Sequence, residues 1–298
     1  MNTDIFREYD IRGIAETDLT PDTVTALSKG YGTLMKRRGC KTVVLGHDLR
    51  LSSPELDRIY LSGLKSVGLH VIRIGQVTTP ALYFAILHYK ADGGVMITGS
   101  HNPIEYNGFK MCQGIASVYG DDIREILRII QAHDFAETHD GSDETRDLMP
   151  DYIDMLKSKF SFPKPLKIVI DAGNATAGPV APQLWRDLGM NVVELYCEPD
   201  GRFPNHLPDP TVPKYMKDLQ KKVLEEKADL GIGYDGDSDR VGAVDNKGRL
   251  IFADTLLALF SRDVLKNKPG SEIIFDVKCS RALPVEIKKY GGIPVMWK

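Results

Sequence analysis

Hydrophobic positions along the chain form short β-branched runs that alternate with longer segments of helical periodicity. In the first unit, a strand at 42–45 is followed by a helix at 53–67, a glycine and a second strand at 71–74. The same order recurs with strands at 167–170 and 192–195 around a helix at 179–188, and again over 273–297. This alternation is typical of βαβ units and predicts an α/β fold built from a repeated unit.

A second repeated feature is a lysine–alanine–aspartate triplet that precedes a polar loop in the first two units. The triplets are Lys90-Ala91-Asp92 and Lys227-Ala228-Asp229. With the same spacing, the third unit would reach its own triplet only beyond residue 298, so we expect an incomplete third unit and a chain that is a fragment. The alternative is a complete chain with a short βαβ cap, which leaves an apolar strand edge unpaired.

The expected domain boundaries follow from length and from one polar segment. A chain of 298 residues suggests about two domains, at roughly 100 to 200 residues each. Residues 137–147 are acidic and without periodicity, which is typical of a surface linker. We therefore expect a first domain over 1–148, a second over 149–252 and the beginning of a third over 253–298.

Composition and charge exclude several classes of protein. With 42% hydrophobic and 27% charged residues, the chain is neither disordered, collagen-like nor a coiled coil. A net charge of −3 is too balanced for nucleic-acid or membrane-surface binding through long-range charge. Apolar runs are too short for a transmembrane helix or a signal peptide, and the four cysteines lack disulfide or zinc spacing. We expect a cytoplasmic protein without nucleic-acid or membrane partners. The sequence does not determine its oligomeric state.

The first candidate for chemistry is the segment TGSHNP at 98–103, which follows a short apolar strand. Ser100 is expected at the carboxyl end of that strand, where ligands bind in open α/β sheets, and Gly99 permits close backbone approach. A serine hydroxyl needs a base, a lowered pKa or a metal to act as a nucleophile, and His101 is adjacent. A Ser/Asn/Pro turn without chemistry is the alternative.

The second candidate is an acidic loop that follows a strand at 228–233. Asp235, Asp237 and Asp239 alternate, and alternate residues of extended backbone point the same way. Three crowded carboxylates favour a hard divalent cation such as Mg²⁺, with Ser100 as a source of a fourth oxygen. An EF-hand is excluded because Arg240 stands where its glycine is required. Solvated turn aspartates remain the alternative.

Three cationic side chains accompany these loops. Arg240 suits bidentate phosphate binding or a salt bridge to a neighbouring aspartate. Arg12, in YDIRG at 9–13, could reach the same cleft or lie on the surface. Lys110 could transfer protons if burial lowers its pKa, or it could be a solvated lysine.

Together these motifs resemble those of the α-D-phosphohexomutase superfamily, in its phosphomannomutase/phosphoglucomutase branch. That branch combines YDIRG, TGSHNP and DGDSDR, all present here in order, and YNGFK at 106–110 and DAGNATAG at 171–178 add to the match. Related phosphoglucosamine mutases typically carry alanine where this chain has Gly99. The resemblance implies tandem mixed-sheet α/β domains of the phosphohexomutase type, four in the family, of which the third is incomplete here.

The resemblance also implies an activity. Members interconvert hexose 6-phosphate and hexose 1-phosphate, of mannose or glucose, through a phosphoserine and a bisphosphorylated sugar. Ser100 would carry the phosphoryl group, and its phosphate with Asp235, Asp237 and Asp239 would bind Mg²⁺. The implied small-molecule partners are the phosphosugar substrate and hexose 1,6-bisphosphate as activator and intermediate.

Around the phosphoserine, the resemblance assigns substrate and phosphate binding to Tyr9, Arg12, Asn102 and Arg240. It places His101 and Lys110 with Ser100 in catalysis, and it leaves the identity of the general base open.

Two other functions remain open. Without the fourth domain, which binds the remote phosphate, we expect weak or no full turnover, because remote binding energy lowers the barrier at the reacting centre. The chain could then act only as a Mg²⁺ and phosphosugar-binding fragment. A phosphatase of the haloacid dehalogenase type would use Asp235 as nucleophile, which leaves TGSHNP and YDIRG without a purpose.

Overall fold

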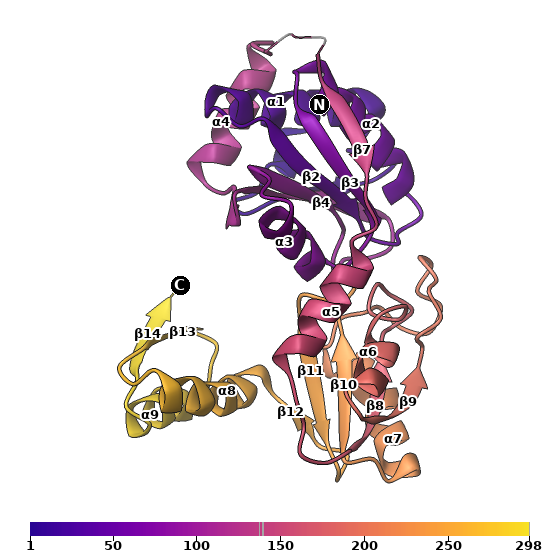
Figure 1. The fold of residues 1–298 in the computed structure, drawn as a ribbon, viewed down its shortest axis with the longest axis vertical. Helices are drawn as coiled ribbons and strands as arrows, with labels where there is room; N and C mark the ends of the chain where they lie inside the picture. Colours follow the sequence, from indigo (N-terminus) through magenta and orange to yellow (C-terminus); the bar gives the residue numbers. More distant parts are fainter. Residues whose placement is uncertain (137, 139, 298) are drawn as a thin grey trace.

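Three α/β units follow one another in the computed structural model, which describes residues 1–136, 138 and 140–297 (Figure 1). They contain a seven-stranded, a five-stranded and a two-stranded sheet. The first two sheets combine parallel and antiparallel strands, so the predicted α/β fold with mixed sheets is confirmed.

The first unit has the strand order β1-β5-β4-β2-β3-β7, and β6 pairs with β5. Because side chains alternate along a strand, β2 contributes Val43 and Leu45 to the core beneath α1, α2 and α4, and Val44 to the core beneath α3. The sheet is therefore covered by helices on both faces. The elements are η1 (Thr3–Ile5), β1 (Ile11–Ile14), α1 (Pro21–Arg37), β2 (Thr42–His47), α2 (Ser53–Ser66), β3 (His70–Gln76), α3 (Thr79–His88), β4 (Gly93–Ile97), β5 (Tyr106–Gln113), β6 (Ala116–Ser117), α4 (Asp121–Gln131) and β7 (Ser142–Thr145).

The second unit has the strand order β12-β11-β10-β8-β9. In β8, Ile168 and Ile170 pack on one face of the sheet and Val169 on the other. The elements are α5 (Met149–Lys159), β8 (Lys167–Asp171), α6 (Ala181–Asp187), β9 (Asn191–Leu195), η2 (Pro213–Met216), α7 (Lys217–Glu226), β10 (Leu230–Tyr234), β11 (Val241–Asp245) and β12 (Leu250–Ile251).

The third unit is smaller and comprises α8 (Ala253–Asn267), β13 (Glu272–Asp276), α9 (Ala282–Lys289) and β14 (Ile293–Trp297). Its two strands pair in parallel, and its core is formed around Leu265, Leu283 and Ile287. Ile274, Met296 and other apolar residues of its strands stay exposed.

The lysine–alanine–aspartate triplets have the same structural role in both units. Lys90 and Lys227 follow a helix in the left-handed conformation, with φ of 53° and 50°. The next aspartate then closes the sheet: Asp92 accepts hydrogen bonds from the amides of Lys41 and Thr42, at 2.7 and 2.9 Å. Asp229 likewise accepts from the amide of Lys167, at 2.9 Å. The repeat in the sequence is thus a repeated link between the end of a helix and the start of a neighbouring strand.

The interpretation of 137–147 as a linker is wrong for its second half. Residues Ser142–Thr145 form β7, which pairs in parallel with β3 at the sheet edge. The strand is mostly exposed and carries polar side chains, so it shows no hydrophobic alternation. Glu137, His139 and Lys298, which the predicted linker and third domain include, lie outside the described residues. The boundary at 148 stays a prediction; Leu148, which precedes α5, and Tyr152 of α5 pack into the first unit's core.

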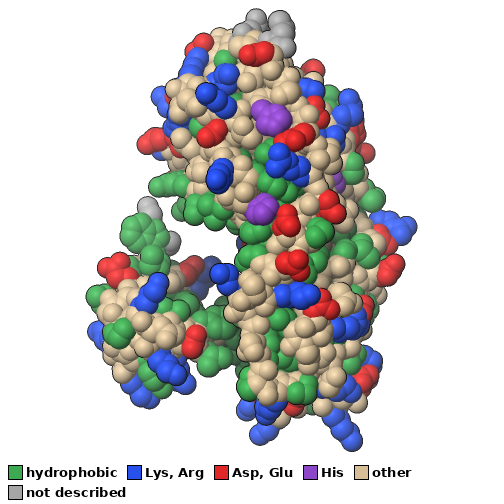
Figure 2. Space-filling model, viewed as in Figure 1, with side chains coloured by type: hydrophobic (Ala, Val, Ile, Leu, Met, Phe, Trp, Pro, Cys, Tyr) green, Lys and Arg blue, Asp and Glu red, His purple; other side chains and the backbone are tan. Residues whose placement is uncertain are grey.

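Surface charge is mixed. On the face drawn in Figure 2, acidic and basic side chains are interspersed among the described residues. Within the part of the chain that the structure describes, none of the helices has both the length and the apolar character that a bilayer crossing requires.

The Asp92 link leads to a stability prediction. Asp92→Ala removes the acceptor for two backbone amides at the start of β2, so it should lower the free energy of unfolding by about 1 kcal/mol in urea denaturation. Asp92→Asn keeps an acceptor oxygen and should cost less. Equal stability of the Ala variant and the unmutated chain would contradict this role.

Candidate active site

Two loops from different units meet at the centre of the molecule. The serine loop (residues 98–105) follows β4, and the acidic loop (residues 235–240) follows β10. The Ser100 hydroxyl donates a hydrogen bond to Asp235 Oδ2 at 2.9 Å, although the residues are 135 positions apart. The amide of Thr79 donates to the carbonyl of Asp237 at 2.9 Å. The structure therefore brings the two predicted loops together at the carboxyl ends of their strands.

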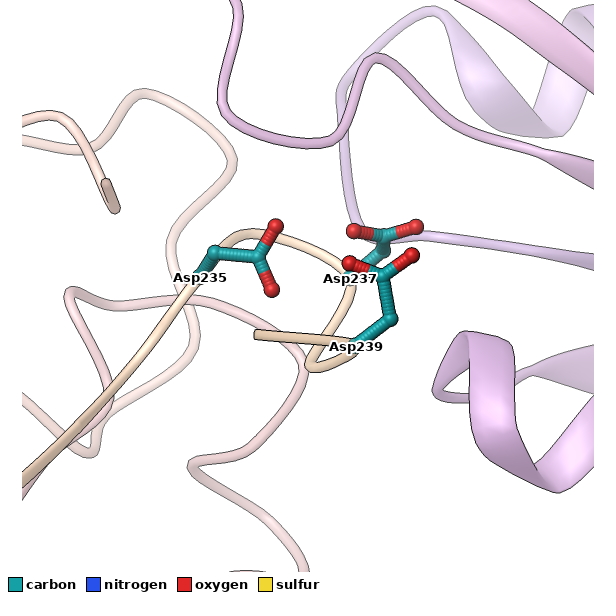
Figure 3. A group of neighbouring side chains, drawn as sticks. All are labelled: Asp235, Asp237 and Asp239. Carbon is teal, nitrogen blue, oxygen red and sulfur yellow. The ribbon is translucent and has the colours of Figure 1, made fainter. Parts of the chain in front are cut away.

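The acidic loop carries a compact cluster of three carboxylates. Ligand oxygens of Asp235, Asp237 and Asp239 all lie within 4.8 Å of one another (Figure 3). Asp235 and Asp237 are fully buried and Asp239 is exposed. The sequence predicts that extended backbone points the three carboxylates the same way. The structure differs, because the loop turns at Ser238, whose φ is 63°, and this turn brings the carboxylates together. Thr176 of the DAGNATAG segment holds the turn by hydrogen bonds to the carbonyl of Gly236 and the Ser238 hydroxyl, both at 2.9 Å.

The Asp237 carboxylate shows that this cluster suits a cation. Its Oδ2 accepts hydrogen bonds from Thr79 Oγ1 and Lys110 Nζ, both at 2.6 Å. Its Oδ1 is buried and has no hydrogen-bond partner among the described residues. An unsatisfied buried carboxylate oxygen is costly, and an oxygen-only ligand set is what hard divalent cations prefer. The three carboxylates could therefore hold a metal ion.

Charges within the cluster are strongly coupled. Burial, together with the Asp237 and Asp239 carboxylates, raises the pKa of Asp235 from 3.8 to about 8. Burial also acts to raise the pKa of Asp237, but the ammonium of Lys110 outweighs it and holds that pKa below its ordinary value. Asp235 is thus the carboxyl group that is protonated near neutral pH when no cation is bound.

Lys110 is ion-paired with two carboxylates of the acidic loop. Burial acts to lower its pKa, but Asp237 and Asp239, at 2.6 and 2.5 Å from Nζ, raise it above the ordinary value. The condition for a neutral, proton-accepting Lys110 is therefore not met in this arrangement. The side chain is an ammonium that links the first unit to the acidic loop.

Ser100 lies in a constrained environment. It is 1% exposed and has a φ of 49°, in the left-handed region that few non-glycine residues adopt. Its Oγ lies 3.1 Å from Nδ1 of His101, in addition to its bond with Asp235. Burial, then Arg240, lowers the pKa of His101, so its imidazole is neutral at pH 7. The serine hydroxyl thus donates to Asp235 and lies within hydrogen-bond distance of an imidazole nitrogen.

Two buried residues that sequence reasoning missed form the scaffold of the serine loop. Asp48 Oδ2 accepts hydrogen bonds from the Thr98 hydroxyl at 2.8 Å and the Gly99 amide at 3.2 Å. Arg50 donates to backbone carbonyls of the loop and of the first residue of β5. The carbonyls belong to Ser100, Asn102, Pro103 and Tyr106. The signal in the sequence was HDLR at 47–50, because β2 ends at the same sheet edge as β4.

The remaining predicted residues surround a cavity of about 530 Å³ beside the serine loop. Its lining includes the predicted site residues Tyr9, Arg12, His101, Lys110, Asp239 and Arg240. Arg12 is largely buried, against the interpretation as a surface arginine, and donates to Asn102 Oδ1 at 2.8 Å. Nε of Arg240 is 3.9 Å from Asp239, so its guanidinium is only loosely paired. A second cavity of similar size lies between β12 and α8 and has a mainly apolar lining far from these loops.

Comparison with known proteins gives the family. Residues 3–137 match the family description "phosphoglucomutase/phosphomannomutase, alpha/beta/alpha domain I", and residues 150–248 match domain II of the same family. The chain belongs to the phosphoglucomutase/phosphomannomutase family of the α-D-phosphohexomutase superfamily, which confirms the resemblance drawn from its motifs.

Individual relatives are similar over nearly the whole chain. A phosphomannomutase/phosphoglucomutase of Pseudomonas aeruginosa is 46% identical over 99% of the chain, and a phosphoglucomutase of Neisseria gonorrhoeae is 43% identical over 99%. The chain spans 63% and 64% of the length of these two relatives. The crystal structure of a phosphoglucomutase/phosphomannomutase family protein from Burkholderia thailandensis has a TM-score of 0.95 and 40% identity, and covers 100% of this chain and 67% of that one.

Gly236 provides a test of the contact between the two loops. A Cβ at this position would lie 2.2 Å from the Ser100 carbonyl oxygen, so Gly236→Ala must separate the loops. We expect a divalent-cation affinity that is about tenfold lower or more, measured by calorimetric titration with Mn²⁺, since Ser100 and Thr79 no longer hold the carboxylates.

The matched control is Gly233→Ala. Its Cβ would meet the flexible Met216 side chain at 3.1 Å, which can shift. The interpretation of Gly236 is wrong if both variants bind Mn²⁺ like the unmutated chain.

Proposed function

We propose that this chain contains the phosphoryl-carrying centre of a phosphohexomutase, with Ser100 as the residue that accepts and donates the phosphoryl group. The overall reaction is the interconversion of hexose 6-phosphate and hexose 1-phosphate, of mannose or glucose. The observation that carries the proposal is the hydrogen bond from Ser100 to Asp235, which places a buried serine hydroxyl against three clustered carboxylates. The names of the relatives, phosphomannomutase and phosphoglucomutase, support the same reaction.

Mg²⁺ is the cation proposed for this centre, held by Asp235, Asp237, Asp239 and an oxygen of the Ser100 phosphate. A bound Mg²⁺ would neutralise negative charge on the transferring phosphoryl group. The unpartnered Oδ1 of Asp237 supports this assignment, because it offers an oxygen that no described residue uses.

Phosphoryl transfer requires one bond to form and one to break. A sugar hydroxyl bonds to phosphorus and gives up its proton, while the bond between phosphorus and Ser100 Oγ breaks and Oγ takes up a proton. His101 is neutral and 3.1 Å from Oγ, so we assign it the acceptance of the Oγ proton when Ser100 is phosphorylated. The imidazolium formed in that step returns the proton to Oγ in the reverse transfer, and the sugar oxygen exchanges its own proton with solvent. Lys110, as an ammonium, contributes positive charge at the edge of the acidic loop.

Substrate binding is assigned to the cavity beside the serine loop. Arg240 presents a loosely paired guanidinium that can bind a phosphate with two parallel hydrogen bonds. Arg12 donates to Asn102 and Asp10, which hold it in place, and its remaining N–H groups can bind a phosphate at the cavity. Tyr9 is exposed at the cavity and offers a ring and a hydroxyl to the sugar. Mannose and glucose are both retained as substrates, because none of the described residues that line this cavity distinguishes between the two sugars.

The proposal separates the half-reaction from full turnover. The chain spans less than two thirds of its two curated relatives, so we propose phosphoryl transfer to Ser100 for the isolated chain and weak or absent mutase turnover. Binding of Mg²⁺ and phosphosugar without transfer is the alternative. An Asp235 nucleophile, as in a haloacid dehalogenase phosphatase, is disfavoured because it leaves the buried Ser100 hydroxyl, 2.9 Å from Asp235 Oδ2, without a role.

Labelling of Ser100 tests the proposed function. We expect the purified chain, incubated with Mg²⁺ and glucose 1,6-bisphosphate, to acquire one phosphate on the peptide that contains Ser100, as located by mass spectrometry. Ser100→Ala should acquire none, and Asp237→Asn should react at least tenfold more slowly, because it loses a carboxylate that balances the cation. Mutase turnover is measured in the same samples.

Each result distinguishes between the functions. A phosphate that hydroxylamine removes would be an acyl phosphate and would indicate Asp235 instead of Ser100. Cation and phosphosugar binding without any phosphate on the chain would favour the binding fragment and contradict the proposal.

The raised pKa of Asp235 predicts a pH-dependent response to Mg²⁺. Without a cation, a carboxyl group whose folded pKa is about 8 contributes stability that is complete below its unfolded pKa near 3.8 and is lost as pH rises through about 8. Mg²⁺ requires the ionised carboxylate, so it should raise Tm more at pH 8 than at pH 5, relative to EDTA. In EDTA, Asp235→Asn should lose less stability between these pH values than the unmutated chain does. The same Mg²⁺ effect at both pH values would contradict the coupling.

A further inference from the structure

Arg50 is a buried cation that makes no contact with the proposed substrate cavity. Its side chain is 1% exposed, and its guanidinium is fixed within the first unit. Nη2 donates to the carbonyls of Ser100 and Asn102 at 2.9 and 2.6 Å, and Nη1 donates to those of Pro103 and Tyr106 at 2.7 and 2.9 Å. One side chain thus fixes four carbonyls from Ser100 to the start of β5.

Asp48 completes this scaffold from the other side. It accepts hydrogen bonds from the Thr98 hydroxyl and the Gly99 amide, and it lies 3.4 Å from Nε of Arg50. The Asp48 carboxylate therefore holds Thr98 and Gly99, which precede Ser100, and the Arg50 guanidinium holds carbonyls of Ser100 and of residues that follow it. Left-handed backbone at a non-glycine residue is unfavourable, and these bonds, with that from the Ser100 amide to Thr98 Oγ1, hold Ser100 at its φ of 49°.

The second unit covers the outer face of Arg50. Phe203 places its ring 5.3 Å from Arg50 Cζ, in a cation–π contact, and is itself only 7% exposed. Phe203 has a φ of 47°, which is an outlier for a bulky side chain. The backbone also runs close here, because a Cβ on Gly201 would lie 2.4 Å from the carbonyl oxygen of Leu49. The strained Phe203 is held where it excludes water from the guanidinium.

We propose that Arg50 is a positioning residue that makes the conformation of the serine loop depend on docking of the second unit. Phe203 is the residue of the second unit whose contact with Arg50 couples docking to the loop. This rests on the proposed function, in which Ser100 carries the phosphoryl group. When Phe203 covers Arg50, all four loop carbonyls keep their donors and Ser100 faces the acidic loop. When Phe203 is withdrawn, water reaches the guanidinium and competes for its donors, and the serine loop loosens. The serine and the carboxylates would therefore be aligned together or not at all.

Amide hydrogen exchange and Ser100 labelling test this on the full chain. Phe203→Ala should raise the exchange rate of amides in residues 98–106 about tenfold, with no change in β2 and β4, since the loop opens while the sheet stays folded. The rate of Ser100 phosphorylation by glucose 1,6-bisphosphate should fall about tenfold at saturation, with the half-saturating concentration changed less than about threefold. Arg50→Lys loses the planar fork and should give a larger effect in the same direction.

Two further variants separate positioning from general stability. Phe203→Tyr keeps an aromatic face over Arg50, so its amide exchange rate in residues 98–106 and its rate of Ser100 phosphorylation should equal those of the unmutated chain. Phe160→Ala removes an exposed aromatic ring of the second unit and should leave both rates unchanged. Because Phe203→Ala keeps the Asp48 and Arg50 pair intact, the test remains valid even if Arg50→Lys fails to fold.

The proposal is overturned if residues 98–106 exchange in Phe203→Ala as in the unmutated chain. It is also overturned if β2 and β4 lose protection equally, since that would indicate general destabilisation. Exchange needs no phosphoryl transfer, so selective loosening of 98–106 in a chain that never labels Ser100 would retain the positioning role and reject the proposed function. Normal labelling of Ser100 in Phe203→Ala, together with unchanged exchange of residues 98–106, would reject the positioning role and retain the proposed function.

Discussion

Burial of two carboxylates at the contact between two units is the constraint on which the rest of this structure depends. Asp235 and Asp237 are fully removed from water, and buried polar or charged groups require partners. Those partners come from the first unit: Ser100, Thr79 and Lys110 all donate to the acidic loop of the second. The units are therefore joined at this point by polar groups that also form the candidate site, so any change in their relative position alters the site as well.

The strand arrangement explains why these groups meet. In the first unit the serine loop follows β4, which pairs with β2, the first strand of the βαβ unit. In the second unit the acidic loop follows β10, which pairs in the same way with β8. The carboxyl ends of these strands face each other across the contact, which brings a serine from one sheet to the aspartates of another. Glycine at position 236 allows the two backbones to approach without an intervening side chain.

Much of this arrangement could be predicted from the sequence, and the parts that could not have physical reasons. Short β-branched hydrophobic runs predict β2, β3, β8 and β9, because each buries side chains in a core. They miss β7, whose exposed edge position leaves no such pattern in Ser142–Thr145. The motifs predicted the meeting of Ser100 with Asp235, whereas the turn at Ser238 depends on a backbone angle that side-chain spacing does not encode. Asp48 and Arg50 were missed because their partners are backbone groups some 50 residues away.

Lys110 gives the acidic loop a counter-ion that belongs to the protein itself. Its ammonium is ion-paired with Asp237 and Asp239, two of the oxygen donors that a divalent cation would use, and it also lines the cavity beside the serine loop. If a cation bound these carboxylates, it would compete with the ammonium for them, and a displaced Lys110 would add positive charge at the cavity. Thermodynamic linkage then requires the reciprocal effect: an anion that draws Lys110 into the cavity tightens cation binding by the same factor. On the proposed function, metal and phosphosugar would thus each be bound more tightly in the presence of the other.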